Sequence, residues 1–169
     1  PHVSLAVDGA YAEYPDNKDY TSGTELVPTA QNVVCLRTFS KIYGLSALRL
    51  GWMYAPHAIL DALNRIRSPF NVNGAALAAG VAAMEDAAFV EQTRAFNNKW
   101  LAWLTQEITA LGLTVAPSIA NFVLVQFTGN TKTAAAANQF MMEHGLIPRE
   151  VANYGLPEYL RISIGLEED

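Results

Sequence analysis

The spacing of hydrophobic residues changes several times along the chain, and each spacing predicts a type of secondary structure. Short continuous apolar runs are typical of strands, whereas apolar residues three and four positions apart are typical of helices. The first such run ends in a carboxylate, as expected of a buried strand of a parallel sheet that carries a functional group at its carboxyl edge. The runs predict strands over residues 3–8, 32–39 and 48–55, with a loop over residues 14–30.

The middle of the chain has the periodicity and the boundary residues of helices. Pro56 suits a first helical turn, Asp86 can cap the start of a longer helix, and Gly112 is a good stop signal. In the longer helix, aromatic and leucine side chains recur at three- and four-residue spacings. The pattern predicts helices over residues 56–67, 74–84 and 86–111.

After Gly112 the pattern becomes that of a compact α+β unit. We expect a strand over residues 121–127, a helix over 131–144, and strands over 146–151 and 159–164. No internal repeat, low-complexity tract or long charge run interrupts the sequence. The pattern therefore predicts an α/β protein with one boundary inside the long helix, giving domains of residues 1–90 and 91–169.

Composition narrows the classes of partner. The 169 residues are 51% hydrophobic and 16% charged, which is enough to bury a substantial core. A net charge of -5 argues against nucleic acid or an anionic membrane as the main partner, since both require excess Lys and Arg. A single cysteine, scattered histidines and the lack of an apolar run of about 18 residues predict a cytoplasmic protein without a metal. A small-molecule ligand fits best.

The candidate chemistry begins at Lys41, directly after the second predicted strand, with Arg49 at the start of the third. A lysine in a partly desolvated pocket beside a cation has a lowered pKa and becomes a nucleophile able to form a Schiff base. The Arg49 guanidinium and the hydroxyls of Thr38 and Ser40 could hold a phosphate dianion. Imine formation and phosphate binding together are what pyridoxal 5'-phosphate (PLP) requires of a protein.

PLP also requires an acidic partner for its pyridine nitrogen, and Asp8 at the end of the first strand meets this requirement. Tyr11 could donate to the phenolate oxygen of the ring. Taken alone, Lys41 would be read as a solvated lysine and Asp8 as a cap. The joint spacing favours the cofactor site.

These residues stand in segments that closely resemble histidinol-phosphate aminotransferases of fold type I. The resembling segments are Asp8-Gly9-Ala10-Tyr11-Ala12-Glu13-Tyr14, Arg37-Thr38-Phe39-Ser40-Lys41-Ile42-Tyr43-Gly44-Leu45 and Leu48-Arg49-Leu50-Gly51-Trp52. The resemblance continues through residues 68–73, 120–122, 148–149 and 160–165, and so covers essentially the whole chain. One departure is Gly9, which stands where many relatives have Glu.

The resemblance implies a role for each candidate residue. Lys41 would bind PLP covalently, and Asp8 would face the pyridine nitrogen and Tyr11 the phenolate oxygen. Ser40 and Arg49 would hold the cofactor phosphate, with Thr38 as a weaker candidate that could instead be only a β-favouring side chain. Arg149 and Arg161 would bind the anionic end groups of the substrate, in an order left open, although Arg149 could instead be a surface ion-pair residue.

The resemblance also implies the architecture: the C-terminal half of the large PLP-binding domain of a fold type I transferase, followed by the small α+β C-terminal domain. A full-length relative would be about twice this size. Its N-terminal half would supply a glycine-containing helix N-terminus for the phosphate, an aromatic residue against the ring and an Asn near the phenolate oxygen. We therefore expect this chain to be a fragment, inactive by itself.

For the parent protein the resemblance implies transamination between L-histidinol phosphate and 2-oxoglutarate in histidine biosynthesis, by a homodimer. Aromatic amino-acid transamination is the alternative within the same chemistry. An alternative of another class is a non-catalytic folded piece that lacks half of the cofactor pocket.

Overall fold

The computed structural model describes residues 3–168, and the chain divides into two compact units. The division falls between Arg94 and Ala95, inside helix α3 (Ala87–Ala110). Each unit has its own sheet and its own hydrophobic core. The expected α/β class is confirmed.

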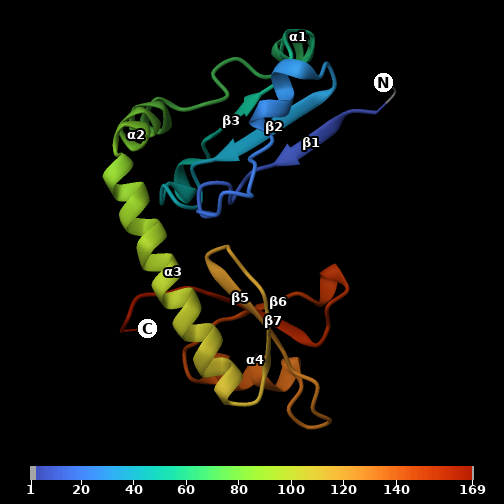
Figure 1. Ribbon diagram of the computed structural model, residues 1–169, viewed down its shortest axis with the longest axis vertical. Helices are drawn as coiled ribbons and strands as arrows, with labels where there is room; N and C mark the ends of the chain where they lie inside the picture. Colours follow the sequence, from blue (N-terminus) through green and yellow to red (C-terminus); the bar gives the residue numbers. More distant parts are fainter. Residues whose placement is uncertain (1–2, 169) are drawn as a thin grey trace. The chain divides into compact units, whose positions relative to one another are not determined.

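The first unit contains a three-stranded sheet in the order β1-β2-β3, formed by Leu5–Asp8, Val33–Thr38 and Gly51–Tyr54. The arrows of β1 and β2 point the same way in Figure 1, and that of β3 points the opposite way. All three predicted strands are present. The third begins at Gly51, because Ser46–Leu48 form a 3-10 turn (η2) and Arg49 adopts a left-handed conformation.

Strand β1 was predicted to be buried, and this prediction was wrong, because most of its residues are exposed. One face of the sheet is covered by the 3-10 helix η1 (Thr24–Thr29), which lies within the predicted loop and packs Val27 against Val33 and Cys35. Leu5 of β1 nevertheless keeps 49% of its surface exposed. An apolar run predicts a strand, but burial also requires neighbours on both sides, and β1 is an edge strand of the described sheet.

The helices begin and end close to where the sequence predicts. They are α1 (His57–Ile66), α2 (Gly74–Glu85) and α3. Asp86 accepts a hydrogen bond from the backbone N–H of Phe89 at 2.9 Å, as expected of a helix cap. Gly112 adopts a φ of 84°, which ends α3 in the conformation that glycine favours. None of the described helices combines the length and the hydropathy needed to cross a membrane.

The second unit is built on an antiparallel sheet in the order β4-β5-β7-β6. Its core joins Leu101 of α3 to Val123, Val125 and Leu160. Its strands are β4 (Thr114–Ala116), β5 (Phe122–Gln126), β6 (Arg149–Glu150) and β7 (Tyr159–Ser163), with helix α4 (Ala134–Glu143) and the 3-10 turn η3 (Ala152–Tyr154) between them. The short strand β4 was not predicted, and β6 is shorter than expected.

Truncation of Leu160 should destabilise the chain, because this side chain is fully buried in the core of the second unit. We expect Leu160→Ala to lower the free energy of unfolding by about 2–5 kcal/mol. Leu111→Ala, at a side chain that is 79% exposed, is the control and should change it by less than about 0.5 kcal/mol. Urea unfolding followed by circular dichroism measures both, and similar values for the two variants would contradict this core.

Tyr14 provides a test of packing in the first unit. Burial, reinforced by Tyr11 and Glu13, raises the pKa of Tyr14 to about 12. Because the pKa in the unfolded chain is about 10, the free energy of unfolding should be unaffected below pH 10 and should fall as the pH rises toward 12. Phenolate absorbance is titrated against pH in the wild type and in Tyr14→Phe. The difference between the two curves belongs to Tyr14 and should have its midpoint near pH 12. A midpoint near the ordinary value of about 10 would contradict the burial.

Candidate functional site

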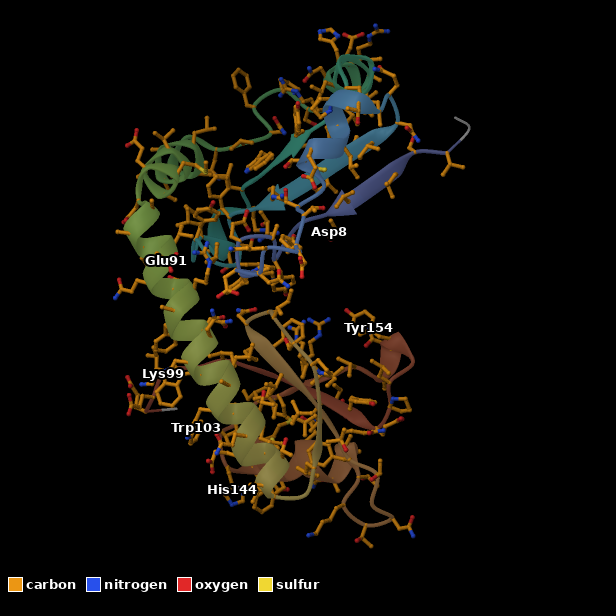
Figure 2. All side chains as sticks on the ribbon, viewed as in Figure 1. Asp8, Glu91, Lys99, Trp103, His144 and Tyr154 are labelled. Atoms are coloured by element: carbon orange, nitrogen blue, oxygen red, sulfur yellow. The ribbon has the colours of Figure 1, made fainter. Side chains whose placement is uncertain are left out.

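The carboxyl ends of β1 and β2 form the edge on which the candidate residues of the first unit lie. The two strands run parallel, with Asp8 opposite Leu36. Thr38 follows two positions after Leu36, so its side chain and that of Asp8 share one face of the sheet. Figure 2 shows Asp8 at the end of β1. The parallel register thus brings a carboxylate and a hydroxyl to one edge and one face.

Asp8 ends β1, and Tyr11 belongs to the tight turn that follows it. The Oδ1 atom of Asp8 accepts a hydrogen bond from the backbone N–H of Ala10 at 3.0 Å. Backbone N–H groups of Ala12 and Tyr14 donate to the carbonyls of Gly9 and Tyr11, both at 3.1 Å. Asp8 therefore caps its own turn and still lies exposed at the sheet edge.

Lys41 lies in the turn that follows β2, where its neighbours fix its position. Phe39 and Ile42 are buried on either side of it. The backbone N–H of Gly44 donates to the Lys41 carbonyl at 2.9 Å, which closes the turn. The Lys41 side chain is half-buried, and its Nζ lies 5.2 Å from the centre of the Tyr11 ring. The structure thus brings together the predicted lysine and tyrosine, which lie 30 positions apart in the sequence.

Ser40 and Arg49 meet across the same turn. The Nη1 atom of Arg49 donates to the Ser40 hydroxyl at 3.2 Å and to the Ser46 carbonyl at 2.6 Å. Arg49 holds a φ of 54° and a ψ of 47°, a left-handed conformation that costs a non-glycine residue roughly 1–2 kcal/mol. Such strain is typical of functional sites, and it is not visible in the residue pattern. A guanidinium and a hydroxyl within hydrogen-bond distance of each other are suitable partners for an anion such as phosphate.

Thr38 does not join this pair directly. Its Oγ1 atom accepts a hydrogen bond from the backbone N–H of Ser40 at 3.0 Å and lies 3.5 Å from the carbonyl of Leu50. The hydroxyl therefore shapes the start of the turn that carries Ser40 and Lys41.

A buried ion pair beneath the Asp8 turn was missed in the sequence. Arg37 of β2 is only 8% exposed, and its Nε lies 3.6 Å from Oε1 of Glu13. Desolvation raises the pKa of Glu13, while its backbone hydrogen bond and the nearby Arg37 and Arg94 oppose this rise. Both residues stand inside the resembling segments, but an arginine on an apolar strand gives no sign of the partner that it will meet.

In the second unit, Arg149 and Arg161 lie directly opposite each other on the antiparallel strands β6 and β7. Arg161 is half-buried, and its guanidinium lies 4.9 Å from the centre of the Phe122 ring. Among the described residues, its Nε has no hydrogen-bond partner. Arg149 is exposed and donates from Nη2 to the hydroxyl of Tyr154 at 3.0 Å; Tyr154 is labelled in Figure 2. The pair forms a cationic site within this unit.

The donor set of the first unit suits an organic anion that carries an electrophilic carbon. It offers one amine, one carboxylate, one phenol, and a guanidinium hydrogen-bonded to a hydroxyl. Within residues 3–168, no group of three or more His, Cys, Asp or Glu side chains could hold a metal ion.

Curated relatives match nearly the whole chain. The chain is 56% identical over 168 residues to a histidinol-phosphate aminotransferase of Rhodopseudomonas palustris, which covers 99% of this chain and 46% of the relative. It is 52% identical over 166 residues to the enzyme of the same name from Rhodospirillum centenum, covering 98% and 46% of the two chains. The chain thus spans about half the length of the curated relatives that it matches.

The fold is also that of known aminotransferase structures. The crystal structure of histidinol-phosphate aminotransferase from Sinorhizobium meliloti in complex with pyridoxal-5'-phosphate matches with a TM-score of 0.88 and 29% identity, over 97% of this chain and 45% of that one. These matches confirm the resemblance seen in the sequence. The model of the family described as aminotransferase class I and II matches residues 2–169. The chain therefore belongs to the class I and II aminotransferase family.

Proposed function

We propose that this chain supplies the PLP lysine and the substrate arginines of a histidinol-phosphate aminotransferase, which transfers an amino group from L-histidinol phosphate to 2-oxoglutarate in histidine biosynthesis. The observation that carries the proposal is the arrangement at the sheet edge, where Lys41 lies over Tyr11 and Arg49 binds Ser40. The names of the relatives, and the PLP complex of the Sinorhizobium enzyme, support it. Residues 1–90 would then belong to the large PLP-binding domain and residues 91–169 to the small C-terminal domain.

The residues at the edge fit PLP group by group. Ser40 and Arg49 would bind the cofactor phosphate, because their hydrogen-bonded pair presents a cation and a hydroxyl together. Thr38 would support them through the backbone of Ser40. Asp8 would keep the pyridine nitrogen protonated, and the Tyr11 hydroxyl would donate to the phenolate oxygen. When bound, PLP supplies an aldehyde that takes up the amino group and a ring that withdraws electrons from the substrate carbon.

Lys41 has two roles in this proposal. It would hold the cofactor covalently through Nζ, and as a free amine the same Nζ would take up the proton that the substrate carbon loses. The buried neighbours Phe39 and Ile42 would keep the backbone of Lys41 in place in both roles.

The arginine pair would favour anionic substrates. Two like charges directly opposite each other on neighbouring strands destabilise a sheet until an anion lies between or over them. The phosphate of L-histidinol phosphate and a carboxylate of 2-oxoglutarate would both relieve this repulsion at the same place. One site would then serve both half-reactions, which predicts ping-pong kinetics.

We also propose that the working enzyme is a homodimer. Leu77, Val81 and Met84 of α2 are each more than half exposed, and their four- and three-residue spacing places them on one helix face. A second copy would bury this face.

Two alternatives remain distinct from this proposal. Aromatic amino-acid transamination would use the same cofactor residues, but no observation favours it over histidinol phosphate. The other alternative is that this chain by itself is a folded, non-catalytic piece. We expect the isolated chain to show no conversion of PLP to its amine form with an amino donor, because its relatives are about twice as long.

Lys41 should be the lysine that reacts with PLP. The full-length protein is mixed with PLP, reduced with borohydride and mapped by peptide mass, and we expect one adduct, at Lys41, and none at the other three lysines of this chain. Lys41→Ala should abolish the adduct, whereas Lys18→Ala should leave it unchanged. Label spread over several lysines, or none in the full-length protein, would contradict the assignment.

The substrate arginines should determine the affinity for histidinol phosphate. In the full-length enzyme, Arg161→Gln and Arg149→Gln should each lower kcat/KM by about 10- to 100-fold, since each removes a charged hydrogen bond to substrate. Arg65→Gln, at an exposed arginine paired with Asp61, is the control. The wild-type enzyme should prefer histidinol phosphate to tyrosine and phenylalanine. A large preference for the aromatic donors would favour the alternative substrate class.

A further inference from the structure

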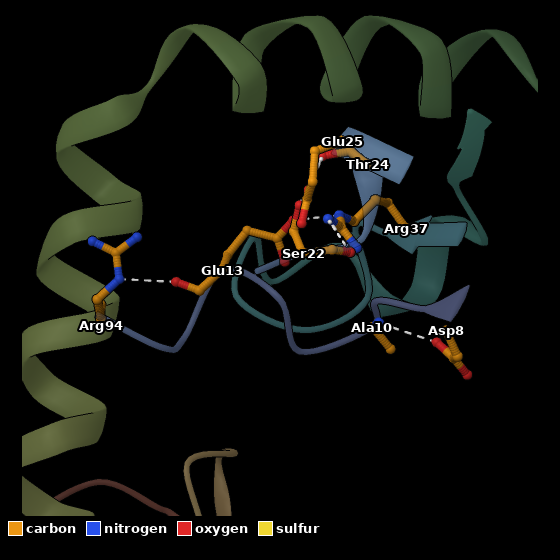
Figure 3. Close-up of polar contacts among 8 residues, drawn as sticks. All are labelled: Asp8, Ala10, Glu13, Ser22, Thr24, Glu25, Arg37 and Arg94. Carbon is orange, nitrogen blue, oxygen red and sulfur yellow. Dashed lines mark hydrogen bonds and ion pairs between the residues drawn. The ribbon is translucent and has the colours of Figure 1, made fainter. Parts of the chain in front are cut away.

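Next to the turn that follows Asp8 and carries Tyr11 lies a cluster of charged residues, all in the first unit: Glu13, Arg37 and Arg94 (Figure 3). Arg37 is the most buried of them and reaches this place from the face of β2 that also carries Val33 and Cys35. Its Nη2 donates to the Ser22 carbonyl at 3.4 Å, and its Cζ lies 5.8 Å from the centre of the Trp52 ring. The guanidinium is thus enclosed between the loop before η1 and strand β3.

The guanidinium occupies the space that a side chain at position 9 would fill. The N–H of Gly9 donates to the Leu36 carbonyl at 2.9 Å, which continues the parallel pairing of β1 and β2 by one residue. A Cβ atom on Gly9 would lie 1.4 Å from Nη1 of Arg37 and 2.9 Å from the Leu36 carbonyl oxygen. Gly9 is not in the left-handed region, so the constraint on this position is the space that Arg37 takes.

The far end of the same turn is held by two arginines. Arg37 approaches the Glu13 carboxylate at 3.6 Å, and the Nε of Arg94 donates to the Glu13 backbone carbonyl at 2.8 Å. Arg94 also pairs with Glu91 on α3. The segment from Gly9 to Glu13 therefore lies on Arg37 at its start and is tied to Arg37 and Arg94 at its end. Asp8 directly precedes this segment and Tyr11 is at its centre.

The energetics of the cluster favour a positional role over a stabilising one. Within the described chain, Nη1 of Arg37 and Oε2 of Glu13 are buried without a hydrogen-bond partner. Buried ion pairs with unmet hydrogen bonds contribute little or nothing to stability compared with apolar residues of similar size. Such a pair does fix the positions of its two side chains, because neither charge can move away without leaving the other unpaired in the interior.

We propose that Arg37 is a positioning residue of the cofactor site: seated in the space left by Gly9 and paired with Glu13, its guanidinium fixes the turn that follows Asp8 and places Tyr11 beside Lys41. The proposal rests on the proposed function, since it assigns to Arg37 the alignment of the two groups that would face the PLP ring. Arg37 itself touches neither the ring nor the substrate in this role.

The test uses the full-length enzyme loaded with PLP and three changes to the cluster. Arg37→Lys keeps the charge and loses the forked geometry. The double variant Glu13→Gln with Arg37→Gln removes both charges together, so that no unpaired charge is left in the interior. Gly9→Ala adds one methyl group against the guanidinium. The matched controls are Asp61→Asn with Arg65→Gln, an exposed ion pair of the same unit, and Gly74→Ala, where the added Cβ meets nothing within 4 Å.

Two readouts report on the cofactor without turnover: the dissociation constant of PLP, and the midpoint of the pH-dependent change in the absorbance of bound PLP. We expect each cluster variant to weaken PLP binding by about tenfold or more and to move the absorbance midpoint, because small displacements of positioned groups carry large effects. Both controls should match the wild type in both readouts.

The outcomes separate the possible failures. Cluster variants that unfold at lower temperature but keep the wild-type PLP affinity and absorbance midpoint would overturn the proposal and leave Arg37 a structural residue only. The proposal would also be overturned if only the double variant changed the PLP affinity and the absorbance midpoint, while Gly9→Ala and Arg37→Lys behaved like the wild type. The packing of the guanidinium against Gly9 would then have no effect on the cofactor. A wild-type enzyme that forms no PLP adduct at Lys41 would overturn the proposed function, and this inference with it.

Discussion

The parallel pairing of β1 with β2 is the interaction on which the candidate site of the first unit depends. Its register sets Asp8 opposite Leu36, and the two turns that leave the strands therefore start from one edge. One turn carries Tyr11 and the other carries Lys41, which is why the ring and the amine meet at 5.2 Å. A shift of the register by one residue would turn Asp8 to the other face and separate it from Thr38.

The interior of the first unit imposes a second constraint through charge. An arginine on the covered face of a small sheet has to find a carboxylate, and here Glu13 provides it from the segment that follows β1. The pair thereby links the backbone after Asp8 to β2, the strand that leads into the lysine turn. The missing side chain of Gly9 is part of this arrangement, because a Cβ at that position would lie 1.4 Å from Nη1 of Arg37 where the guanidinium stands in this chain.

The second unit uses charge in the opposite way. Its two arginines face each other across β6 and β7 with no described carboxylate in a salt bridge to either. Such a pair is unfavourable in a sheet without a counter-ion, and stacking of Arg161 on Phe122 and the bond from Arg149 to Tyr154 offset only part of the cost. Anionic substrates would supply the missing charge, so the same feature that weakens the sheet would provide the substrate specificity.

The sequence by itself determined most of the elements of this chain and its family. The runs before Asp8 and Lys41 predicted β1 and β2, Asp86 and Gly112 marked the ends of α3, and the motifs indicated the family that the matches confirm. These features are local, because strand runs, caps and motif residues act through their immediate neighbours. Only the tertiary structure decided the left-handed backbone of Arg49, the exposure of β1, and the pairings of Arg37 with Glu13 and of Arg149 with Arg161. Each of these depends on partners distant in the sequence or on what covers a strand, and neither strand register nor burial is set by residues close along the chain.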